Sequence, residues 1–508
     1  MKNGRTHRFL PETAPTTRRA FLAGTMASAA ACLAPSGARR LFSPALAQPD
    51  RARDADKTIR LALVGDMYLF AHFSSAFHVH DNVEVAALCN PDQRELSETI
   101  EMWRERAEEW PDSGDPPERE AAARYQRLME AGPPVFADFR EMLEQMGGEF
   151  DGVIVSTFDH LHGPIAGPAI RAGKHVFCER PLGLTIHESR KLAELAEQHQ
   201  VATSIRNPGN ASGQFRRAVE VIRDGLIGEV REAHVWFDRG GAAREQPPSN
   251  GHDVPAGLHW NLWLGPAAAR DYHPEWMNYA EWRDFSNGGI GTFGPHAANL
   301  PFMALNMHTL WEDGHGEPIE AEAECSGAND LSFPEWEIIR WRIPSRGEAP
   351  PVRLTWHHGP GFPEPSRDKL HELFREHGVT SADEREKLIG YAGALVIGSE
   401  GAVASDDHNV NCVLLPKEKF ADMPLDAPEE LPASQGHYND WLHACRGGEQ
   451  PWAHFGYATA LSQLLMVGNI ATRYPEQTLR FDPATGEIIN HDDANQHVSY
   501  EYREGWSL

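Results

Sequence analysis

The chain has 508 residues, of which 41% are hydrophobic and 24% are charged. This balance is typical of a soluble globular protein, and the length suits two or three domains. The 47 basic and 74 acidic residues give a formal net charge of −27, and such a surface repels nucleic acid and anionic membranes. We therefore expect neither of them as a partner. The six cysteines include no C-x-x-C pair, and the sequence predicts no metal centre.

The first residues contain the three parts of a twin-arginine signal peptide. Residues 17–22 (TRRAFL) carry the arginine pair, residues 23–34 are small and mildly apolar, and residues 45–47 (ALA) form a small-x-small cleavage site. We expect residues 1–47 to be removed and the mature protein to be periplasmic or otherwise exported. No later segment has the roughly 18 apolar residues that span a bilayer, so we expect a soluble mature protein, with lipid anchoring at Cys32 as a minor alternative.

Short apolar runs alternate with helical segments over residues 58–206. Such runs are typical of parallel strands buried on both faces. Their alternation with helices predicts an α/β fold with a doubly wound, Rossmann-like parallel sheet. The expected strands are residues 58–64, 83–88, 151–156, 174–178 and 201–205. The expected helices are a crossover at 68–80, two pieces within 95–130, and 182–200.

Strand-like segments dominate after residue 206. They predict a C-terminal α+β domain over residues 207–480, built on a large, open, mainly antiparallel sheet. The expected strands are residues 230–237, 336–343, 352–356, 394–397 and 403–405, and the expected helices are 215–224, 437–444 and 456–472. Residues 365–390 are charged and helix-prone, which predicts a surface insertion. We expect residues 481–508 to form a C-terminal tail.

Several blocks of the chain resemble, in the same order, blocks of the Gfo/Idh/MocA family, which includes glucose–fructose oxidoreductase and inositol dehydrogenase. These blocks are residues 151–181 (DGVIVSTFDHLHGPIAGPAIRAGKHVFCERP), 225–239 and 258–296. Residues 436–444 and 494–506 resemble an exported subgroup of that family. The resemblance implies NAD or NADP in the first domain, a carbohydrate substrate beside it, and a homo-oligomer formed through the open sheet.

The loop after the first strand departs from a dinucleotide-binding glycine motif. Glycines there let backbone N–H groups approach the pyrophosphate, but only Gly65 remains, followed by Asp66 and Met67. Asn90 stands where an acidic residue usually binds the ribose, and Arg94 could reach a 2′-phosphate. We take Gly65, Met67 and Asn90 as cofactor-binding candidates, with NAD or NADP left open. The alternatives are a nucleotide bound in altered geometry, a tightly bound nucleotide, and a nucleotide that has been lost.

Thr157, His160 and His162 follow the strand that ends at residue 156, at the edge where open α/β sheets bind ligands. The resemblance implies that they line the nicotinamide side of the site. It also implies that Asn207, after the last parallel strand, lies there. For each histidine, a structural role at a helix start is the alternative.

Glu179-Arg180-Pro181 matches the Glu-Lys-Pro motif of the family. The resemblance implies that these residues contact the cofactor, and that residue 180 also binds substrate and assists proton transfer. Arginine does not practically lose its proton. We therefore expect Arg180 to orient the substrate in catalysis without acting as a general base.

Residues 288–296 (GGIGTFGPH) match a family block in which an aspartate precedes a histidine by four residues. Here Thr292 takes the aspartate position. His296 is the candidate general acid/base, because an unperturbed imidazole titrates near neutral pH. The aromatic cluster around Trp282 is either a sugar-stacking surface or ordinary core. The substrate-side candidates are Arg180, Trp282, Arg283, Thr292 and His296.

These motifs predict an exported NAD(P)-dependent oxidoreductase that acts on a hydroxyl of a sugar, glycoside or polyol. In this hypothesis His296 takes the hydroxyl proton and Arg180 orients the substrate. Two alternatives remain. One is a redox-neutral glycosidase or epimerase-type enzyme with tightly bound NAD. The other is a non-catalytic carbohydrate-binding protein on a degenerate Rossmann frame.

Overall fold

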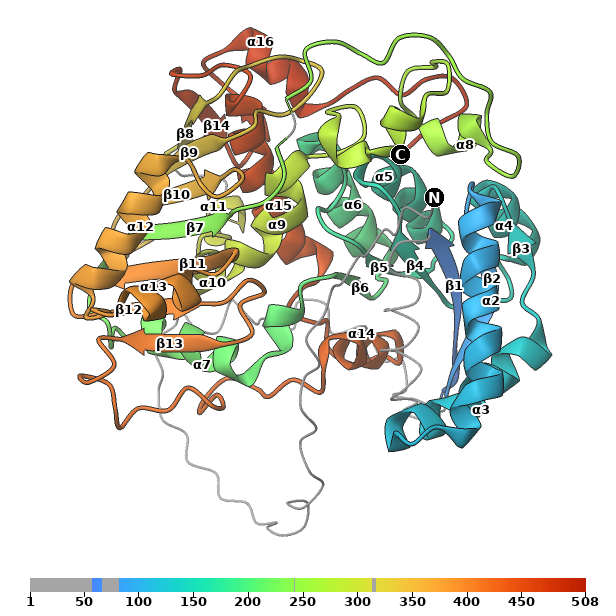
Figure 1. Cartoon of the computed structure of the whole chain (residues 1–508), viewed down its shortest axis with the longest axis horizontal. Helices are drawn as coiled ribbons and strands as arrows, with labels where there is room; N and C mark the ends of the chain where they lie inside the picture. Colours follow the sequence, from blue (N-terminus) through green and yellow to red (C-terminus); the bar gives the residue numbers. More distant parts are fainter. Residues whose placement is uncertain (1–56, 66–81, 242, 313–316) are drawn as a thin grey trace, which may run out of the picture. The chain divides into compact units, whose positions relative to one another are not determined.

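The computed structural model describes residues 57–65, 82–241, 243–312 and 317–508 (Figure 1). The expected signal peptide, the expected crossover helix at 68–80 and Met67 lie outside these residues. The described chain builds one sheet of six strands and one of nine. Two helices, α9 (Gly288–Ala297) and α15 (Phe455–Ala471), pack against the second sheet, and α15 also contacts the first domain.

The N-terminal sheet is parallel throughout, with the order β3-β2-β1-β4-β5-β6. This order confirms the predicted Rossmann-like fold. Every residue of β4 and β5 is buried, as expected for parallel strands covered on both faces. The strands are β1 (Ile59–Gly65), β2 (Val83–Cys89), β3 (Val135–Phe136), β4 (Gly152–Ser156), β5 (His175–Cys178) and β6 (Thr203–Ile205).

Helices connect these strands and begin at polar caps. Asp92 caps the first of them through the Arg94 N–H, and Thr185 and Glu188 form a reciprocal capping box. The two α-helices that lie between β2 and β3, α2 and α3, are the two pieces expected within residues 95–130. The helices are α2 (Gln93–Glu109), η1 (Trp110–Asp112), α3 (Pro116–Ala131), α4 (Phe139–Met146), α5 (Asp159–Arg171) and α6 (Ile186–His199).

The second sheet has the order β13-β12-β11-β7-β10-β9-β8-β14-β15. Among the described strands, β7 and β10 pair in parallel and the other pairs are antiparallel, which confirms the predicted architecture. Its strands are β7 (Val230–Phe237), β8 (Ile319–Cys325), β9 (Glu337–Ile343), β10 (Val352–His358), β11 (Ala392–Gly398), β12 (Ala402–Ser405), β13 (Cys412–Leu415), β14 (Leu479–Asp482) and β15 (Glu487–Ile488).

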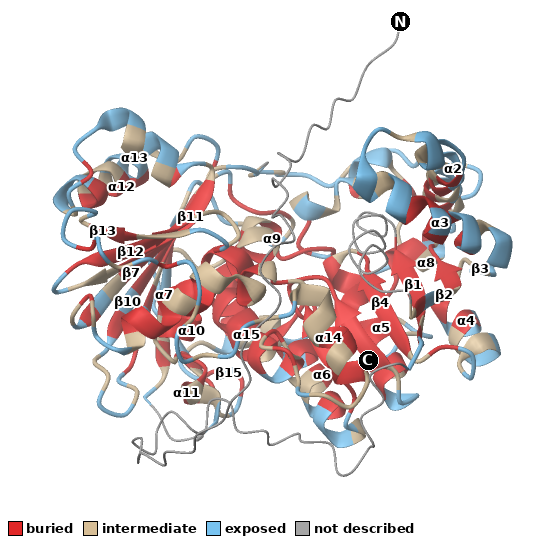
Figure 2. Ribbon diagram, turned by 90° about the horizontal axis from the view of Figure 1, so that it is seen from below, coloured by how far each residue is buried: buried red, intermediate tan, exposed pale blue. Residues whose placement is uncertain are grey.

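Helices cover the two faces of this sheet unequally. Its largest apolar core lies under α7, α9, α10 and α15, while α12 and α13, the expected insertion, pack on the opposite face and expose their outer sides (Figure 2). The remaining helices are η2 (Pro208–Ala211), α7 (Gly213–Arg223), α8 (Trp260–Leu264), η3 (Pro274–Met277), η4 (Tyr279–Glu281), α10 (Asn299–Ala304), α11 (Thr309–Glu312), α12 (Glu364–Glu376), α13 (Ala382–Ile389), α14 (His437–Cys445), α16 (Asp492–Asn495) and η5 (Gln496–Val498).

Away from α12 and α13, that opposite face carries charged side chains. Arg340 Nη2 lies 3.1 Å from Glu324 Oε2, and Arg353 Nη2 lies 2.9 Å from Glu232 Oε2. These cross-strand pairs keep the face polar. This is the surface to which the resemblance assigns the homo-oligomer, which stays a prediction.

Several segments after residue 430 contact the first domain. Helix α14 buries Trp441 and Leu442 against the Rossmann sheet. In the expected tail, β15 joins the second sheet, and the Tyr502 hydroxyl donates to Glu188 Oε1 at 2.5 Å. Arg140 Nη1 donates to Gly505 O at 2.8 Å. The end of the chain is therefore packed structure. None of the described helices is long and apolar enough to cross a membrane.

Candidate active site

The carboxyl end of β1 approaches the end of β4 so closely that only glycine fits. Gly65 has a φ of 107°, and a Cβ there would lie 1.9 Å from Ser156 O. Both the backbone conformation and the close contact require glycine. The close packing of β1 against β4 therefore explains why Gly65 is a glycine. Residues 66–81, which follow at the phosphate-loop position, lie outside the described part of the chain.

At the end of β2, Asn90 closes a turn. Asn90 Oδ1 accepts the Asp92 N–H at 2.8 Å, which is an Asx turn. The Asp92 carboxylate in turn pairs with Arg94, whose Nε lies 2.8 Å from Asp92 Oδ1. Arg94 is therefore engaged within the turn, and this contact weakens the argument for a 2′-phosphate partner.

Two buried polar atoms at this sheet edge have no hydrogen-bond partner among the described residues: Asn90 Nδ2 and Ser156 Oγ. Leaving a buried polar group unpaired costs about 1–3 kcal/mol. The two residues stand at the carboxyl ends of β2 and β4, which flank β1, where open α/β sheets bind ligands. An amide donor and a hydroxyl at these places fit the ribose and phosphate oxygens of a dinucleotide.

The two histidines of α5 make internal contacts. His162 Nδ1 lies 2.9 Å from Pro181 O and its Nε2 lies 3.1 Å from Thr157 O, so this ring joins the loops after β4 and β5. His160 Nε2 lies 3.0 Å from Trp263 O, and burial lowers the His160 pKa to about 4. Both rings are fully buried. These contacts favour the structural alternative that the sequence left open for both histidines, and their contact with a cofactor stays a prediction.

Glu179 anchors two arginines at the ends of β5 and β6. Its fully buried carboxylate contacts Arg180 Nη1 and lies 3.6 Å from Arg206 Nη1. A buried carboxylate is strongly destabilising unless cations neutralise it, so these pairs fix both guanidinium groups. Arg206 also hydrogen-bonds Tyr438 of α14. Arg180 is 9% exposed and keeps its positive charge.

His296 lies near the end of α9, beside Asn207. Its Nδ1 is 3.4 Å from Asn207 Oδ1, and Asn207 Nδ2 donates to an α9 carbonyl at 2.7 Å. Burial lowers the His296 pKa well below its usual value, and the charges of His408, Arg180 and Arg206 add to this effect. The structure thus brings together Arg180, Asn207 and a neutral His296, three of the residues that the sequence assigned to the site.

The loop between β12 and β13 adds two side chains that the sequence analysis missed. The His408 ring centroid lies 4.6 Å from that of His296, and His408 Nδ1 lies 3.1 Å from Asp407 Oδ2. The local signal is the Asp-Asp-His run at 406–408 between two strands, but nothing local links it to α9. Half-buried Thr292, at the aspartate position of the family block, has no carboxylate. The carboxylate in this part of the site therefore comes from a distant loop.

Trp282 and Arg283, assigned to the substrate side, are committed to internal contacts instead. Trp282 is 1% exposed, and its indole donates to a backbone carbonyl at 2.9 Å. Arg283 donates to Ser332 O at 2.8 Å and to Asn469 Oδ1 and Thr472 Oγ1 at 2.9 Å each. The aromatic cluster around Trp282 is a packed core, which favours the core alternative.

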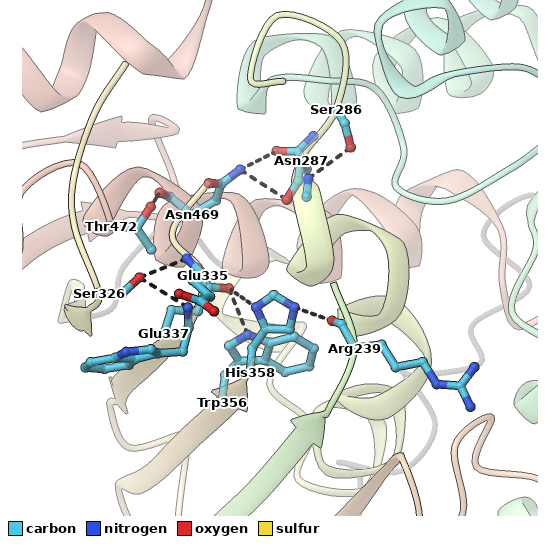
Figure 3. Close-up of polar contacts among 12 residues, drawn as sticks. Arg239, Ser286, Asn287, Ser326, Glu335, Glu337, Trp356, His358, Asn469 and Thr472 are labelled. Carbon is cyan, nitrogen blue, oxygen red and sulfur yellow. Dashed lines mark hydrogen bonds and ion pairs between the residues drawn. The ribbon is translucent and has the colours of Figure 1, made fainter. Parts of the chain in front are cut away.

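A polar network supports the start of α9 (Figure 3). Asn469 Nδ2 donates to Asn287 Oδ1 at 3.0 Å. Nearby, His358 Nε2 lies 2.7 Å from Arg239 O and its Nδ1 lies 3.5 Å from Glu337 Oε1. The Asn469–Asn287 bond joins the start of α9 to α15, and the His358 contacts join the neighbouring ends of β7, β9 and β10. In the described part of the chain, no group of three His, Cys, Asp or Glu side chains is arranged to hold a metal ion.

Comparison with known proteins places the first domain. Residues 59–206 match the GFO_IDH_MocA model, described as an oxidoreductase family with an NAD-binding Rossmann fold. An uncharacterized oxidoreductase of Schizosaccharomyces pombe is 32% identical over 151 residues, 28% of this chain and 40% of the relative. The 1,5-anhydro-D-fructose reductase of Ensifer adhaerens is 33% identical over 96 residues, 18% of this chain and 29% of the relative.

A glycosyl hydrolase family 109 protein of Shewanella pealeana is 26% identical over 180 residues, 35% of each chain. The chain therefore spans less than half the length of each of these relatives. Two solved structures resemble nearly the whole described chain. The WlbA dehydrogenase from Bordetella pertussis, in complex with NADH and UDP-GlcNAcA, has a TM-score of 0.51 at 15% identity and covers 84% of this chain and 99% of its own.

The aldose-aldose oxidoreductase from Caulobacter crescentus, in complex with glycerol, has a TM-score of 0.50 at 15% identity, over 84% of this chain and 100% of its own. Likeness at such identity shows a shared fold. The family match adds to that fold a specific assignment for the first domain. Over residues 59–206 the chain is similar to the GFO_IDH_MocA oxidoreductase family, whose model is that of an NAD-binding Rossmann fold.

Proposed function

We propose that this protein is an NAD(P)-dependent oxidoreductase that acts on a hydroxyl group of a sugar, glycoside or polyol. The observation that carries the proposal is the meeting of two sets of groups at one sheet edge. Asn90 and Ser156 supply orphaned polar atoms, and Arg180 lies within electrostatic reach of His296. The family match and the sugar-acting relatives support the reaction and the substrate class.

The chain's own groups have separate tasks in this reaction. A nicotinamide, when bound, supplies the hydride acceptor. Asn90 Nδ2 and Ser156 Oγ would hold its ribose and phosphate oxygens. Arg180, fixed by Glu179, would orient the substrate hydroxyl and stabilise negative charge on its oxygen as the proton leaves. Neutral His296 would accept a hydrogen bond from the substrate.

The direct test is the nucleotide content of the mature protein. We expect denaturation of protein purified without added nucleotide to release NAD or NADP, identified by mass spectrometry. If the protein is purified empty, a nucleotide at 100 times its Kd should stabilise it by about 2.7 kcal/mol. Protein that neither retains nor binds a nucleotide would contradict the proposal.

Ser156→Ala tests the site more finely. Removing the orphaned hydroxyl should weaken nucleotide binding several-fold, because a neutral hydrogen bond contributes about 0.5–1.5 kcal/mol. Ser97→Ala, on the exposed side of α2, is the matched control and should leave the affinity unchanged. Equal affinities for both variants would place the nucleotide elsewhere.

A second candidate is redox-neutral chemistry on a glycoside with a tightly bound NAD. The match to the glycosyl hydrolase family 109 protein favours it. Turnover of a glycoside without added nucleotide would support this candidate, and strict dependence on added NAD(P)+ would oppose it. Calorimetry that detects sugar binding without nucleotide binding or turnover would instead select a carbohydrate-binding protein.

We also propose export through the twin-arginine pathway, supported by the arginine pair of residues 17–22 and the cleavage site of residues 45–47. The secreted form should begin at Gln48, which N-terminal sequencing would check. Replacing Arg18 and Arg19 together with lysine should hold the precursor in the cytoplasm. Export of that double variant at the normal rate would contradict the proposal.

A further inference from the structure

The connection between β12 and β13 places an imidazole directly against His296. The His408 and His296 ring centroids are 4.6 Å apart with an interplanar angle of 46°. Phe293 of α9 packs edge-on against both rings at 5.5 Å. The two histidines therefore share one wall, although they come from different elements of the second domain.

Asp407 fixes the His408 ring and its protonation pattern. Asp407 Oδ2 lies 3.1 Å from His408 Nδ1, and its Oδ1 accepts the His408 N–H at 2.9 Å. The Tyr391 hydroxyl donates to the same carboxylate. Burial alone would raise the Asp407 pKa, but the hydrogen bonds from His408 and Tyr391 hold that pKa below its usual value. An ionised Asp407 keeps the proton on His408 Nδ1 and leaves Nε2 as the acceptor.

His408 and His296 differ in what surrounds them. The His408 side chain is 34% exposed, and its Nε2 makes no hydrogen bond with the described residues. The ionisable groups that face it are Asp407, Tyr391 and His296, and Arg239 stacks on the Tyr391 ring. His296 is 1% exposed and contacts an amide. A proton taken up at His408 thus has a carboxylate beside it and access to water.

We propose that His408, held by Asp407, is the general base of the site, and that His296 positions His408 and the substrate. This proposal rests on the proposed function. The O–H bond of the substrate hydroxyl breaks and an N–H bond forms at His408 Nε2. The oxygen beside Arg180 gains negative charge, and the imidazole becomes an imidazolium paired with Asp407. Loss of hydride to the nicotinamide is the step that the proposed function already contains.

Asp407→Asn tests the pairing, and Asp406→Asn is the matched control. Asparagine keeps the shape of Asp407 but removes the charge that stabilises the imidazolium. Asp406 lies in the same loop. Its Oδ1 accepts the Val410 N–H at 2.8 Å, which the asparagine oxygen can still accept, and its Oδ2 accepts from Asn411 at 2.5 Å, so the control loses one exposed hydrogen bond. We measure turnover of a panel of aldoses and polyols with NAD+ and NADP+, as a function of pH.

We expect Asp407→Asn to lower kcat by about 100-fold or more, within the range of general-base effects, and to change KM little. The acidic limb of the kcat/KM profile should move to lower pH. Tyr391→Phe should move that limb to higher pH, because the carboxylate then interacts more strongly with His408. Asp406→Asn should match the wild type in both rate and profile.

A second readout needs no substrate. The protein is labelled with [13C]histidine, and His408→Gln identifies the His408 ring signal. The midpoint of its protonation should move to lower pH in Asp407→Asn and stay in place in Asp406→Asn. An unchanged midpoint in Asp407→Asn, or wild-type kcat in His408→Gln, would overturn the proposal. A wild-type protein without nucleotide or turnover would refute the proposed function, while the NMR titration would still decide the pairing.

Discussion

Replacing Arg283 with lysine separates a packing role from a substrate-binding role. Arg283 is 6% exposed, and its guanidinium donates to Ser332, Asn469 and Thr472 at 2.8–2.9 Å. Lysine keeps the charge, but its single nitrogen cannot span the three acceptors, and we expect it to retain one. Each hydrogen bond to a charged group contributes about 1.5–3 kcal/mol. The free energy of unfolding should therefore fall by about 3–6 kcal/mol.

The loss of stability of Arg283→Lys relative to the wild type should also depend on pH. Burial lowers the Arg283 pKa to about 9, and the charge of Arg473 adds to this effect. Lysine starts from a lower pKa than arginine, so the same surroundings would bring the substituted lysine toward neutral pH. A depressed pKa in the folded state means that the unfolded chain binds more protons, so stability rises with pH. The difference in unfolding free energy between Arg283→Lys and the wild type should therefore become smaller between pH 7 and pH 9.

Urea unfolding followed by tryptophan fluorescence, together with KM for sugar and nucleotide, measures both roles. Arg342→Lys is the matched control, because its side chain is 74% exposed and lies 3.7 Å from Glu320. An exposed pair of this kind contributes about 0–1 kcal/mol. If Arg283→Lys proved as stable as the control but raised KM, the packing assignment would be refuted and the substrate assignment restored.

Three further perturbations test the fold. Burial lowers the pKa of His160 to about 4, so on acidification the unfolded chain binds the proton first. Lowering the pH from 7 to 5 should therefore destabilise the protein by about 2 kcal/mol for each such histidine. A urea-unfolding free energy that does not change with pH would contradict this. Gly65→Ala should lower the free energy of unfolding, measured by calorimetry, by more than about 3 kcal/mol. Gly173 also has a positive φ, but no atom lies within 4 Å of an added Cβ, so Gly173→Ala should lower it by about 1 kcal/mol. Tyr502→Phe should cost about 1–3 kcal/mol by removing a donor to a buried glutamate of α6, and Tyr500→Phe, whose hydroxyl has no partner among the described residues, should be nearly neutral in the same assay.

The strands that the sequence predicted are those whose own composition requires burial. The residues of β4 (GVIVS) are apolar or small, and both faces of the sheet are covered. The sequence analysis missed β8 because IEAEAEC alternates alanine with glutamate, two residues that favour helices. Its glutamates become strand residues only when β9 brings Arg340 and Arg342 opposite them. The short β13, β14 and β15 have too few residues to show a period.

The predictable part of the site is the part that lies in contiguous motifs. Arg180 and His296 were identified from short runs at the ends of a strand and a helix, where sequence order fixes position. Asp407 was not identified, because its place beside α9 depends on how β12 and β13 join the far edge of the sheet. The internal contacts of Arg283 could not be predicted for a related reason. Its sequence neighbours suggest a site, whereas its acceptors come from α15 and from the loop before β9.

The departures from the family pattern form one consistent set under the general-base proposal. Arg180 cannot release its proton, so it binds and orients. Thr292 brings no carboxylate, and the cations around His296 oppose its protonation. A base at this edge therefore requires an imidazole that has its own carboxylate and contact with water. His408 with Asp407 meets both conditions within van der Waals reach of His296. The substitutions at positions 180 and 292 are then compatible with catalysis, because the proton-accepting task moves to the β12–β13 loop.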